Sequence, residues 1–133
     1  MIIGMGTDLL DMRRIEKLMA RYEDRFAERY FTAIEQSLAE SRREAGRHID
    51  TYAKRFAAKE ACAKALGRGI DDGIYMKDIG VVNNAAGAPE LVLTGGALAR
   101  LNEITPKGKT AVLHLSITDE PPLAQAHVII EAR

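Results

Sequence analysis

The sequence contains no tryptophan, only three phenylalanines and a single cysteine, Cys62, among its 133 residues. A lone cysteine excludes a disulfide framework and a zinc site built from cysteines, so we expect Cys62 to be a small packing residue. Because large aromatic side chains are scarce, the core should be aliphatic and of modest size for a chain of this length. Self-association would help such a chain bury more apolar surface.

Net charge and a long apolar run are also missing. The 19 basic and 19 acidic residues cancel, so the composition gives no reason for nonspecific attraction to nucleic acid or membrane. No apolar run approaches the roughly 20 residues of a membrane span, and residues 1–10 lack a basic leader and a cleavage site. We therefore expect a cytoplasmic protein. The arginines concentrate between Arg13 and Arg68, which suits an acidic partner, a phosphorylated ligand or a solvated helical face.

Local patterns predict an α+β protein with helices early and strands late, in one domain over residues 1–133. We expect the N-terminal helices to pack on a small antiparallel sheet. One helix should begin at Met12 behind an Asp11 N-cap, and another at the capping box of Thr32 and Glu35. Gly46 and Gly67 are candidate helix ends. The remaining predicted elements are strands at 2–8, 78–83, 90–94, 110–118 and 124–131, and helices at 51–66 and 95–104.

The stretch RFAAKEACAKALG, residues 55–67, places a glutamate and a lysine in an alanine-rich helix. Glu60 and Lys64 are four residues apart and therefore project side by side. An ordinary surface pair of this kind stabilises a helix by roughly 0.2–0.5 kcal/mol and does nothing more. The small neighbours also leave room for a ligand, a metal ion or another backbone, so both interpretations remain open.

Asp8 ends the first predicted strand, on the side that also carries Gly4 and Gly6. It could simply accept a hydrogen bond from a nearby backbone N–H. Together with Glu60, it could instead hold a hard divalent cation whose other positions are filled by water, the usual mode for magnesium on a phosphate substrate. Lys64 would then reach the same phosphates as a point charge.

His114 lies on the more polar face of the predicted strand 110–118, with Val112, Ser116 and Thr118. It could be a half-exposed strand residue, or a hydrogen-bond donor or proton carrier near a phosphate. His48 and His127 have no comparable context, and we assign them no role.

Together these segments resemble the holo-[acyl-carrier-protein] synthase family, the short bacterial 4′-phosphopantetheinyl transferases. The resemblance covers nearly the whole chain, in the family's order and spacing. It is carried by GTDLLDMRRI at 6–15, FTAIE at 31–35, RFAAKEACAKALG at 55–67 and HLSIT at 114–118.

The resemblance implies an Mg²⁺-dependent enzyme that transfers 4′-phosphopantetheine from coenzyme A to a serine of apo acyl carrier protein and releases 3′,5′-ADP. The holo carrier would serve fatty acid synthesis. Family members are α+β proteins that typically form trimers with active sites between subunits. Carried over by position, the metal ligands are Asp8 and Glu60, and Lys64 contacts the coenzyme A phosphates. Arg55 and His114 are further coenzyme A contacts.

The first helix carries the residues expected to meet the carrier. By resemblance, Arg14 faces the acidic carrier protein. The neighbouring arginines extend this position into a basic strip, defined here as Arg13, Arg14, Arg21 and Arg25. Docking through such a strip should weaken as salt rises. The sequence does not choose between a metal-bound water and a carboxylate as the group that accepts the serine proton.

Two positions depart from the family pattern. Ala88 stands where many relatives carry a basic residue in the turn near the adenine. Any contact of this turn with coenzyme A would therefore come from the backbone of Gly87 to Pro89. Asp119 follows HLSIT where some members have a second histidine, and we assign it no catalytic role. Two other functions remain open: a carrier-binding module without catalysis, and a metal-dependent phosphoesterase acting on a small nucleotide.

Overall fold

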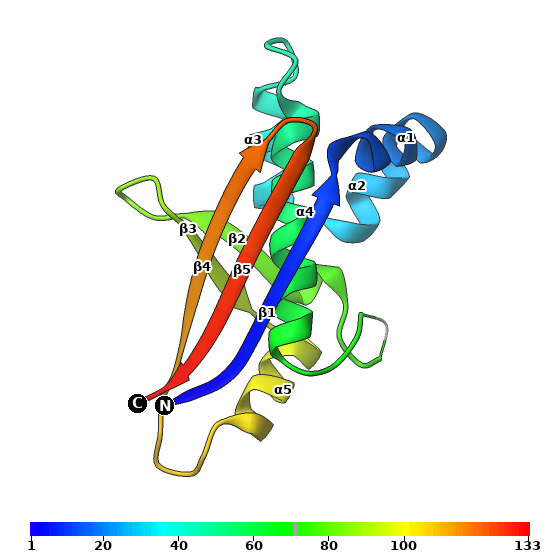
Figure 1. Cartoon of the computed structure of the whole chain (residues 1–133). Helices are drawn as coiled ribbons and strands as arrows, with labels where there is room; N and C mark the ends of the chain where they lie inside the picture. Colours follow the sequence, from blue (N-terminus) through cyan, green and yellow to red (C-terminus); the bar gives the residue numbers. More distant parts are fainter. Residues whose placement is uncertain (71) are drawn as a thin grey trace.

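The computed structural model describes residues 1–70 and 72–133, and its strands form two antiparallel sheets (Figure 1). The three-stranded sheet has the order β1-β5-β4, and the other sheet is the pair β2-β3. The strands are β1 (Ile2–Asp11), β2 (Ile79–Asn83), β3 (Pro89–Leu93), β4 (Ala111–Glu120) and β5 (Leu123–Ala132). The α+β class is confirmed, but the single expected sheet is replaced by two.

Five α-helices and one 3₁₀ turn connect these strands within the part of the chain that the structure describes. They are α1 (Met12–Tyr22), α2 (Asp24–Tyr30), α3 (Ala33–Ser41), α4 (His48–Ala65), η1 (Met76–Asp78) and α5 (Gly95–Ile104). The expected caps are present: the Asp11 side chain accepts from the Arg13 N–H, and Thr32 and Glu35 form the capping box. Gly46 and Gly67 both have positive φ, as expected for residues that end helices.

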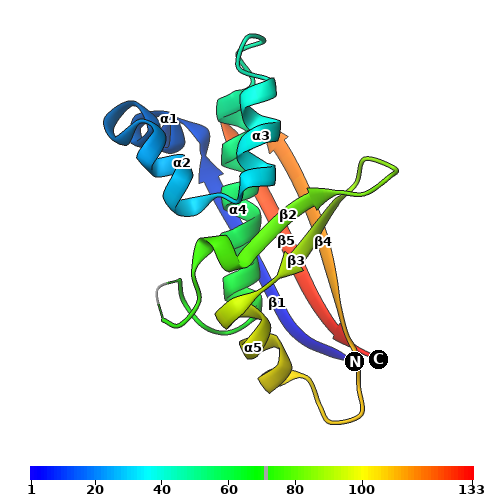
Figure 2. The same ribbon diagram turned by 180° about the vertical axis from the view of Figure 1, so that it is seen from behind.

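The central element is α4, which lies along one face of the three-stranded sheet (Figure 1). Viewed from behind, α3, the β2-β3 pair and α5 lie on the other side of α4 (Figure 2). Ala53, Ala57, Ala58 and Ala61 of α4 are fully buried. The alanine-rich composition thus serves close packing on all sides of this helix.

Two glycines of β1 set the distance between strand and helix. A Cβ at Gly4 would lie 2.2 Å from the carbonyl oxygen of Ala65, and one at Gly6 would lie 2.0 Å from that of Ala61. Real side chains do not approach backbone atoms so closely, so only glycine permits this contact. The strand therefore delivers Asp8 directly onto the last turns of α4.

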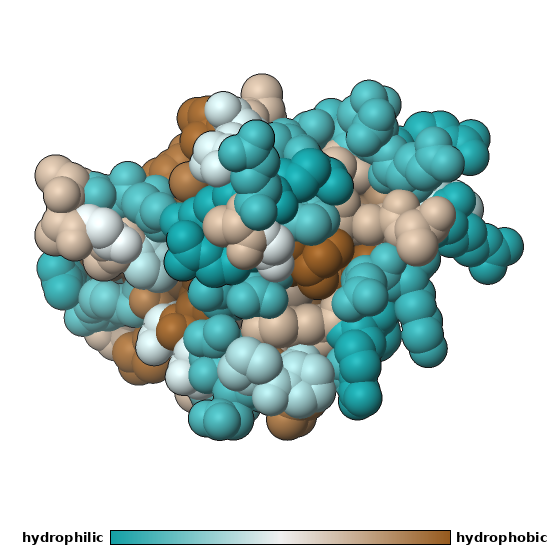
Figure 3. Space-filling model, turned by 90° about the horizontal axis from the view of Figure 1, so that it is seen from above, coloured by the Kyte–Doolittle hydropathy of each residue, from teal (hydrophilic) through white to brown (hydrophobic). Residues whose placement is uncertain are grey.

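The opposite face of the three-stranded sheet is exposed and partly apolar. Met5, Leu9 and Ile129 project there with exposed fractions of 73%, 61% and 36%. From above, by contrast, the surface is mostly hydrophilic, with hydrophobic residues in smaller areas (Figure 3). Among the described residues, no helix combines the length and apolarity that crossing a membrane requires.

Candidate functional site

Asp8 and Lys64 meet where β1 crosses α4. Lys64 Nζ donates to Asp8 Oδ1 at 3.1 Å and to the carbonyl oxygen of Thr7 at 2.9 Å. The Lys64 side chain is half-exposed, whereas that of Asp8 is mostly covered. The local capping role considered for Asp8 belongs to Asp11. We expected Lys64 either to pair with Glu60 or to contact a ligand. In the structure it bridges β1, which carries Asp8, and α4, which carries Glu60.

Glu60 precedes Lys64 by one helical turn and is about half-buried. Burial raises the pKa of its carboxyl, and the charge of Asp8 raises it further, while Lys64 and Arg14 oppose these effects. A charge influences a pKa in this way only when it is near. Lys64, one turn after Glu60 on α4, contacts Asp8 of β1, so the two carboxylates belong to elements that meet here; that they share one cation stays a prediction.

This donor set fits a hard divalent cation. Two carboxylates that repel each other at a partly buried place provide the charge and the oxygen ligands that Mg²⁺ prefers. Within residues 1–70 and 72–133, no group of three or more His, Cys, Asp or Glu side chains could hold a metal. The remaining ligand positions would therefore fall to water and substrate phosphates, which is how Mg²⁺ is commonly bound.

Glu60 also borders a cleft of about 740 Å³ between α1, α2, α4 and the segment that leads to β2. Three arginines line it, two of which, Arg14 and Arg25, belong to the predicted basic strip. The third, Arg29, was not predicted; it follows Arg25 by one helical turn, and that spacing is the signal that could have indicated it. Between the arginines the cleft is apolar, with side chains that include Leu18, Phe26 and Phe56.

The other two residues of the basic strip have local partners. Arg13 forms a bidentate pair with Asp11, and this hydrogen bonding lowers the pKa of Asp11 to about 2. The Arg21 guanidinium lies 5.1 Å from the ring centroid of Tyr22. The structure thus brings Arg14 and Arg25 to the cleft beside Glu60, and places Arg13 at the N-cap of α1.

A second, more polar cavity of about 230 Å³ brings Arg55, Gly87 and Pro89 together. Arg42 and Lys54 also line it, so three cationic side chains surround one small space. Arg55 is 5% exposed, and its Nη2 donates to Asn83 Oδ1 at 3.4 Å. Its Nε is buried and has no hydrogen-bond partner among the described residues. Burial lowers the pKa of Arg55, as does the nearby charge of Arg42, although a guanidinium stays charged. The cavity is suited to an anion.

His114 lies elsewhere. Ile117 and Asp119 of β4 line the Arg55 cavity, whereas His114 projects from the opposite face of the same strand. Its Nε2 lies 3.0 Å from Glu131 Oε1 of β5, and this hydrogen bond lowers the pKa of Glu131. Within one copy of the chain, His114 and Arg55 therefore do not face the same space.

Sequence reasoning missed the buried ion pair between Glu35 and Lys59, whose side chains are both fully buried. The capping box was recognised, but a capping glutamate is ordinarily exposed, and nothing in the spacing connects it to a lysine 24 positions later. Cys62 is buried as expected, and burial raises the pKa of its thiol to about 12. It is therefore a packing residue and not a nucleophile.

Comparison with known proteins places this arrangement in a family. A family model described as the 4′-phosphopantetheinyl transferase superfamily matches residues 4–118. The chain belongs to this superfamily. A holo-[acyl-carrier-protein] synthase of Mesorhizobium japonicum is 58% identical over 132 residues, which cover 99% of this chain and 94% of that relative. The predictions of the family and of an enzyme are thereby confirmed.

Solved structures of the superfamily share the fold. The holo-[acyl-carrier-protein] synthase of Neisseria meningitidis superposes with a TM-score of 0.84 at 36% identity, over 98% of this chain and 99% of that chain. The Bacillus anthracis protein of the same name, solved in complex with CoA (3′,5′-ADP), gives a TM-score of 0.77 at 34% identity. That match covers 100% of this chain and 99% of the other.

Proposed function

We propose that this protein transfers the 4′-phosphopantetheine group of coenzyme A to a serine hydroxyl of an apo acyl carrier protein, with Mg²⁺ as cofactor. The observation that carries the proposal is the contact of Lys64 with Asp8 at the junction of β1 and α4, one helical turn after Glu60. The serine oxygen forms a bond to the phosphorus that bears pantetheine, and the bond from that phosphorus to 3′,5′-ADP breaks. Such transfers need positioning and charge neutralisation more than covalent help from the enzyme.

Each residue of this triad has a distinct task. Asp8 and Glu60 would hold Mg²⁺, which supplies positive charge to the pyrophosphate of the substrate. Lys64 already spans from α4 to Asp8, and its half-exposed ammonium can turn from that carboxylate to a phosphate oxygen. The nucleophile arrives with the carrier, so the enzyme needs no activated serine or cysteine of its own.

The nucleotide end of coenzyme A fits the Arg55 cavity. Arg42, Lys54 and Arg55 supply cationic donors for a phosphate group, and the buried Arg55 Nε offers a hydrogen bond that no described residue accepts. The turn from Gly87 to Pro89 closes one side with backbone groups, since Ala88 brings no charge. These contacts would anchor the substrate at a distance from the reacting phosphorus.

A homotrimer with active sites between subunits accounts for His114. This side chain belongs to the exposed sheet face that also carries Met5, Leu9 and Ile129. Association through that face would bury these apolar residues and let His114 of one copy approach coenzyme A bound to a neighbour. Light scattering of the purified protein tests this, and a trimer is expected. A monomer at micromolar concentration would show that His114 does not contact coenzyme A.

The carrier would dock on α1 and α2. Arg14 and Arg25 line the cleft that holds Glu60, so an acidic carrier helix bound there would present its serine beside the metal ligands. Arg13 and Arg21 would add positive charge at the periphery. The fatty acid synthase carrier as the physiological partner, and the cytoplasm as the site of action, stay predictions.

Mass spectrometry of an apo carrier incubated with the protein, coenzyme A and Mg²⁺ tests the proposal. We expect the carrier to gain the mass of one phosphopantetheine group and 3′,5′-ADP to appear in equal amount. Cleavage of coenzyme A without that gain would indicate a phosphoesterase. Binding of the carrier without either product would indicate a module that has lost catalysis.

A further inference from the structure

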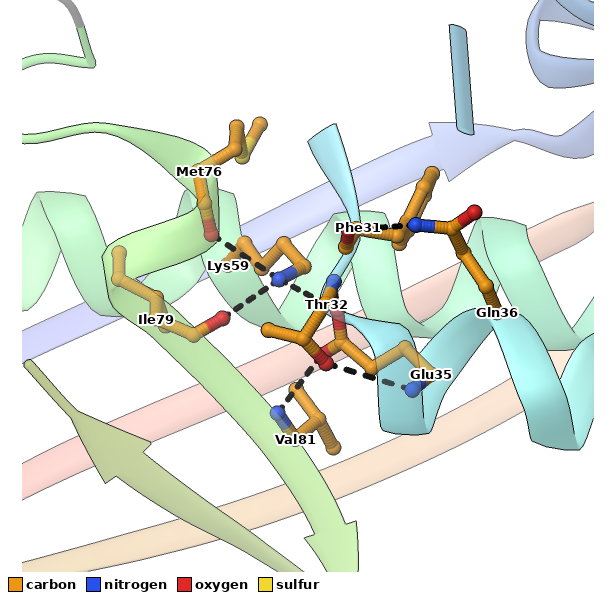
Figure 4. Close-up of polar contacts among 8 residues, drawn as sticks. All are labelled: Phe31, Thr32, Glu35, Gln36, Lys59, Met76, Ile79 and Val81. Atoms are coloured by element: carbon orange, nitrogen blue, oxygen red, sulfur yellow. Dashed lines mark hydrogen bonds and ion pairs between the residues drawn. The ribbon is translucent and has the colours of Figure 1, made fainter. Parts of the chain in front are cut away.

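A buried ion pair and its hydrogen bonds connect α4 to three other segments of the chain (Figure 4). Lys59 Nζ lies 2.7 Å from Glu35 Oε1 and donates to the carbonyl oxygens of Met76, at 3.0 Å, and Ile79, at 2.5 Å. The two charged side chains have no exposed surface. One lysine of α4 thus contacts α3, η1 and the start of β2.

The polar groups of this cluster are fully paired. Lys59 Nζ donates to two carbonyl oxygens and forms an ion pair with Glu35, so three oxygen atoms surround an ammonium that carries three N–H groups. Glu35 accepts from the backbone N–H of Thr32 at 2.8 Å and, through its other oxygen, from that of Val81 at 2.7 Å. A fully satisfied buried network of this kind allows few alternative arrangements of the segments it joins.

Two of the segments that Lys59 joins, α4 and η1, contribute residues to the cleft. Glu60 follows Lys59 directly, and successive helical residues point about 100° apart, so fixing Lys59 fixes the direction of Glu60. Met76, whose carbonyl oxygen Lys59 binds, lines the cleft together with Glu60. Neither Glu35 nor Lys59 is among the residues that line the cleft.

We propose that Glu35 and Lys59 are positioning residues for the transfer reaction. Their ion pair sets the rotation of α4 about its axis and the place of the Met76 wall, so that Glu60 is directed toward Asp8 before substrate arrives. The inference rests on the proposed function, because it assigns the pair's role through the metal ligand Glu60. Outer groups that orient metal ligands typically change metal affinity or activity by about 10–100-fold when altered.

A purely structural pair would behave differently. Replacing a buried ion pair by neutral side chains of similar size is often tolerated, whereas removing one partner leaves the other charge buried and unpaired. The double variant Glu35→Gln/Lys59→Met removes both charges at nearly constant volume. If the pair only stabilises the fold, the folded double variant should bind Mg²⁺ like the wild type.

The experiment titrates Mg²⁺ into coenzyme A-loaded protein by calorimetry, without carrier, and separately measures the transfer rate over a range of Mg²⁺ concentrations. We expect the folded double variant to bind Mg²⁺ about tenfold more weakly or worse, with a matching rise in the Mg²⁺ concentration for half-maximal rate. Loss of folded protein alone would lower the maximal rate and leave that concentration unchanged. Glu35→Asp, which keeps the charge but shortens the reach, is the second variant if the double variant does not fold.

The matched control is Ile130→Ala, which removes a fully buried side chain of β5 opposite Gly4, four residues before Asp8 along β1. It should lower stability without weakening Mg²⁺ binding. Wild-type Mg²⁺ affinity in the double variant, or in Glu35→Asp if that is the one that folds, would overturn the positioning role. If the wild type itself bound no Mg²⁺ and transferred nothing, the proposed function would fail instead, and the two failures are therefore distinct.

Discussion

The close approach of β1 to α4 at Gly6 can be tested by a single methyl group. In Gly6→Ala, the new Cβ would lie 2.0 Å from the Ala61 carbonyl oxygen and 2.7 Å from the Ala65 backbone nitrogen. Ordinary contact begins at 3.4 Å, so strand and helix must separate by about 1.4 Å or distort. Neither atom belongs to a side chain that could rotate away. The same movement would carry Asp8 away from Glu60.

Two losses should therefore appear together. Overpacking of a core typically costs about 1–3 kcal/mol in the free energy of unfolding, and backbone obstacles favour the upper end of that range. A displacement of about 1 Å at a catalytic site can lower the rate by about 10²-fold. Urea denaturation measures the first loss, and the rate of carrier modification, with protein kept well below its unfolding midpoint, measures the second.

Gly69→Ala is the matched control, because a Cβ at Gly69 meets no atom within 4 Å and its backbone does not have positive φ. That change should leave the rate unaltered and alter stability by less than about 1 kcal/mol. If Gly6→Ala proved as stable and as active as Gly69→Ala, the packing argument for how Asp8 reaches α4 would be refuted.

Three further predictions concern the charges of the site. Burial and the charge of Asp8 raise the pKa of Glu60, so metal-free Glu60→Gln should be more stable than wild type at high pH. The difference should vanish as pH falls through that raised pKa, and urea denaturation between about pH 4 and pH 8 would show it; a pH-independent difference would contradict it. Arg14→Glu should raise the KM for the carrier about tenfold or more and weaken its salt dependence, whereas Arg13→Glu should do less because Asp11 already pairs with Arg13. Equal effects in steady-state kinetics would count against the cleft as the docking site. Arg55→Gln should raise the KM for coenzyme A about tenfold, and should raise the KM for an analogue without the 3′-phosphate by less. An equal rise in both KM values would show that the 3′-phosphate does not bind in this cavity.

Local signals in the sequence were sufficient for the elements whose ends depend on their own residues. Asp11 caps one helix by a contact with the residue two positions later, and Thr32 and Glu35 cap another across three positions. Contacts between residues so close in the chain can be predicted from the sequence. Glu23 was not foreseen: it ends α1 with φ of 52°, and a glutamate gives no warning of a left-handed conformation. Because Glu23 interrupts the first helix, three helices precede residue 46, where two were expected.

Features that depend on tertiary contacts could not be predicted. β1 continues to Asp11, past the expected end at residue 8, because it pairs along its length with β5, a partner more than 100 residues away. The helix expected from residue 51 begins at His48, and Arg42 of the preceding segment bonds to Thr51 in its first turn. The ion pair of Glu35 with Lys59 likewise depends on the way α3 and α4 pack.

The residues of the candidate site stay a prediction, whereas part of the geometry around them depends on contacts that the sequence does not show. The family motifs pointed to Asp8, Glu60 and Lys64, but the contact of Lys64 with Asp8 depends on the two glycines that let β1 approach the helix. Arg55 and the Gly87–Pro89 turn, predicted separately, line one cavity. His114, predicted with them, lies on the other face of β4, since strand alternation separates it from Ile117 and Asp119.

The central claim is that Asp8 and Glu60 hold one divalent cation against the pyrophosphate of coenzyme A. A crystal structure of the protein with coenzyme A and Mg²⁺ measures this most directly. The account predicts a single ion bound to both carboxyl groups, at about 2.1 Å or through one bound water, and also to phosphate oxygens. An ion bound elsewhere, or carboxyl groups of Asp8 and Glu60 that share no ligand, would contradict it.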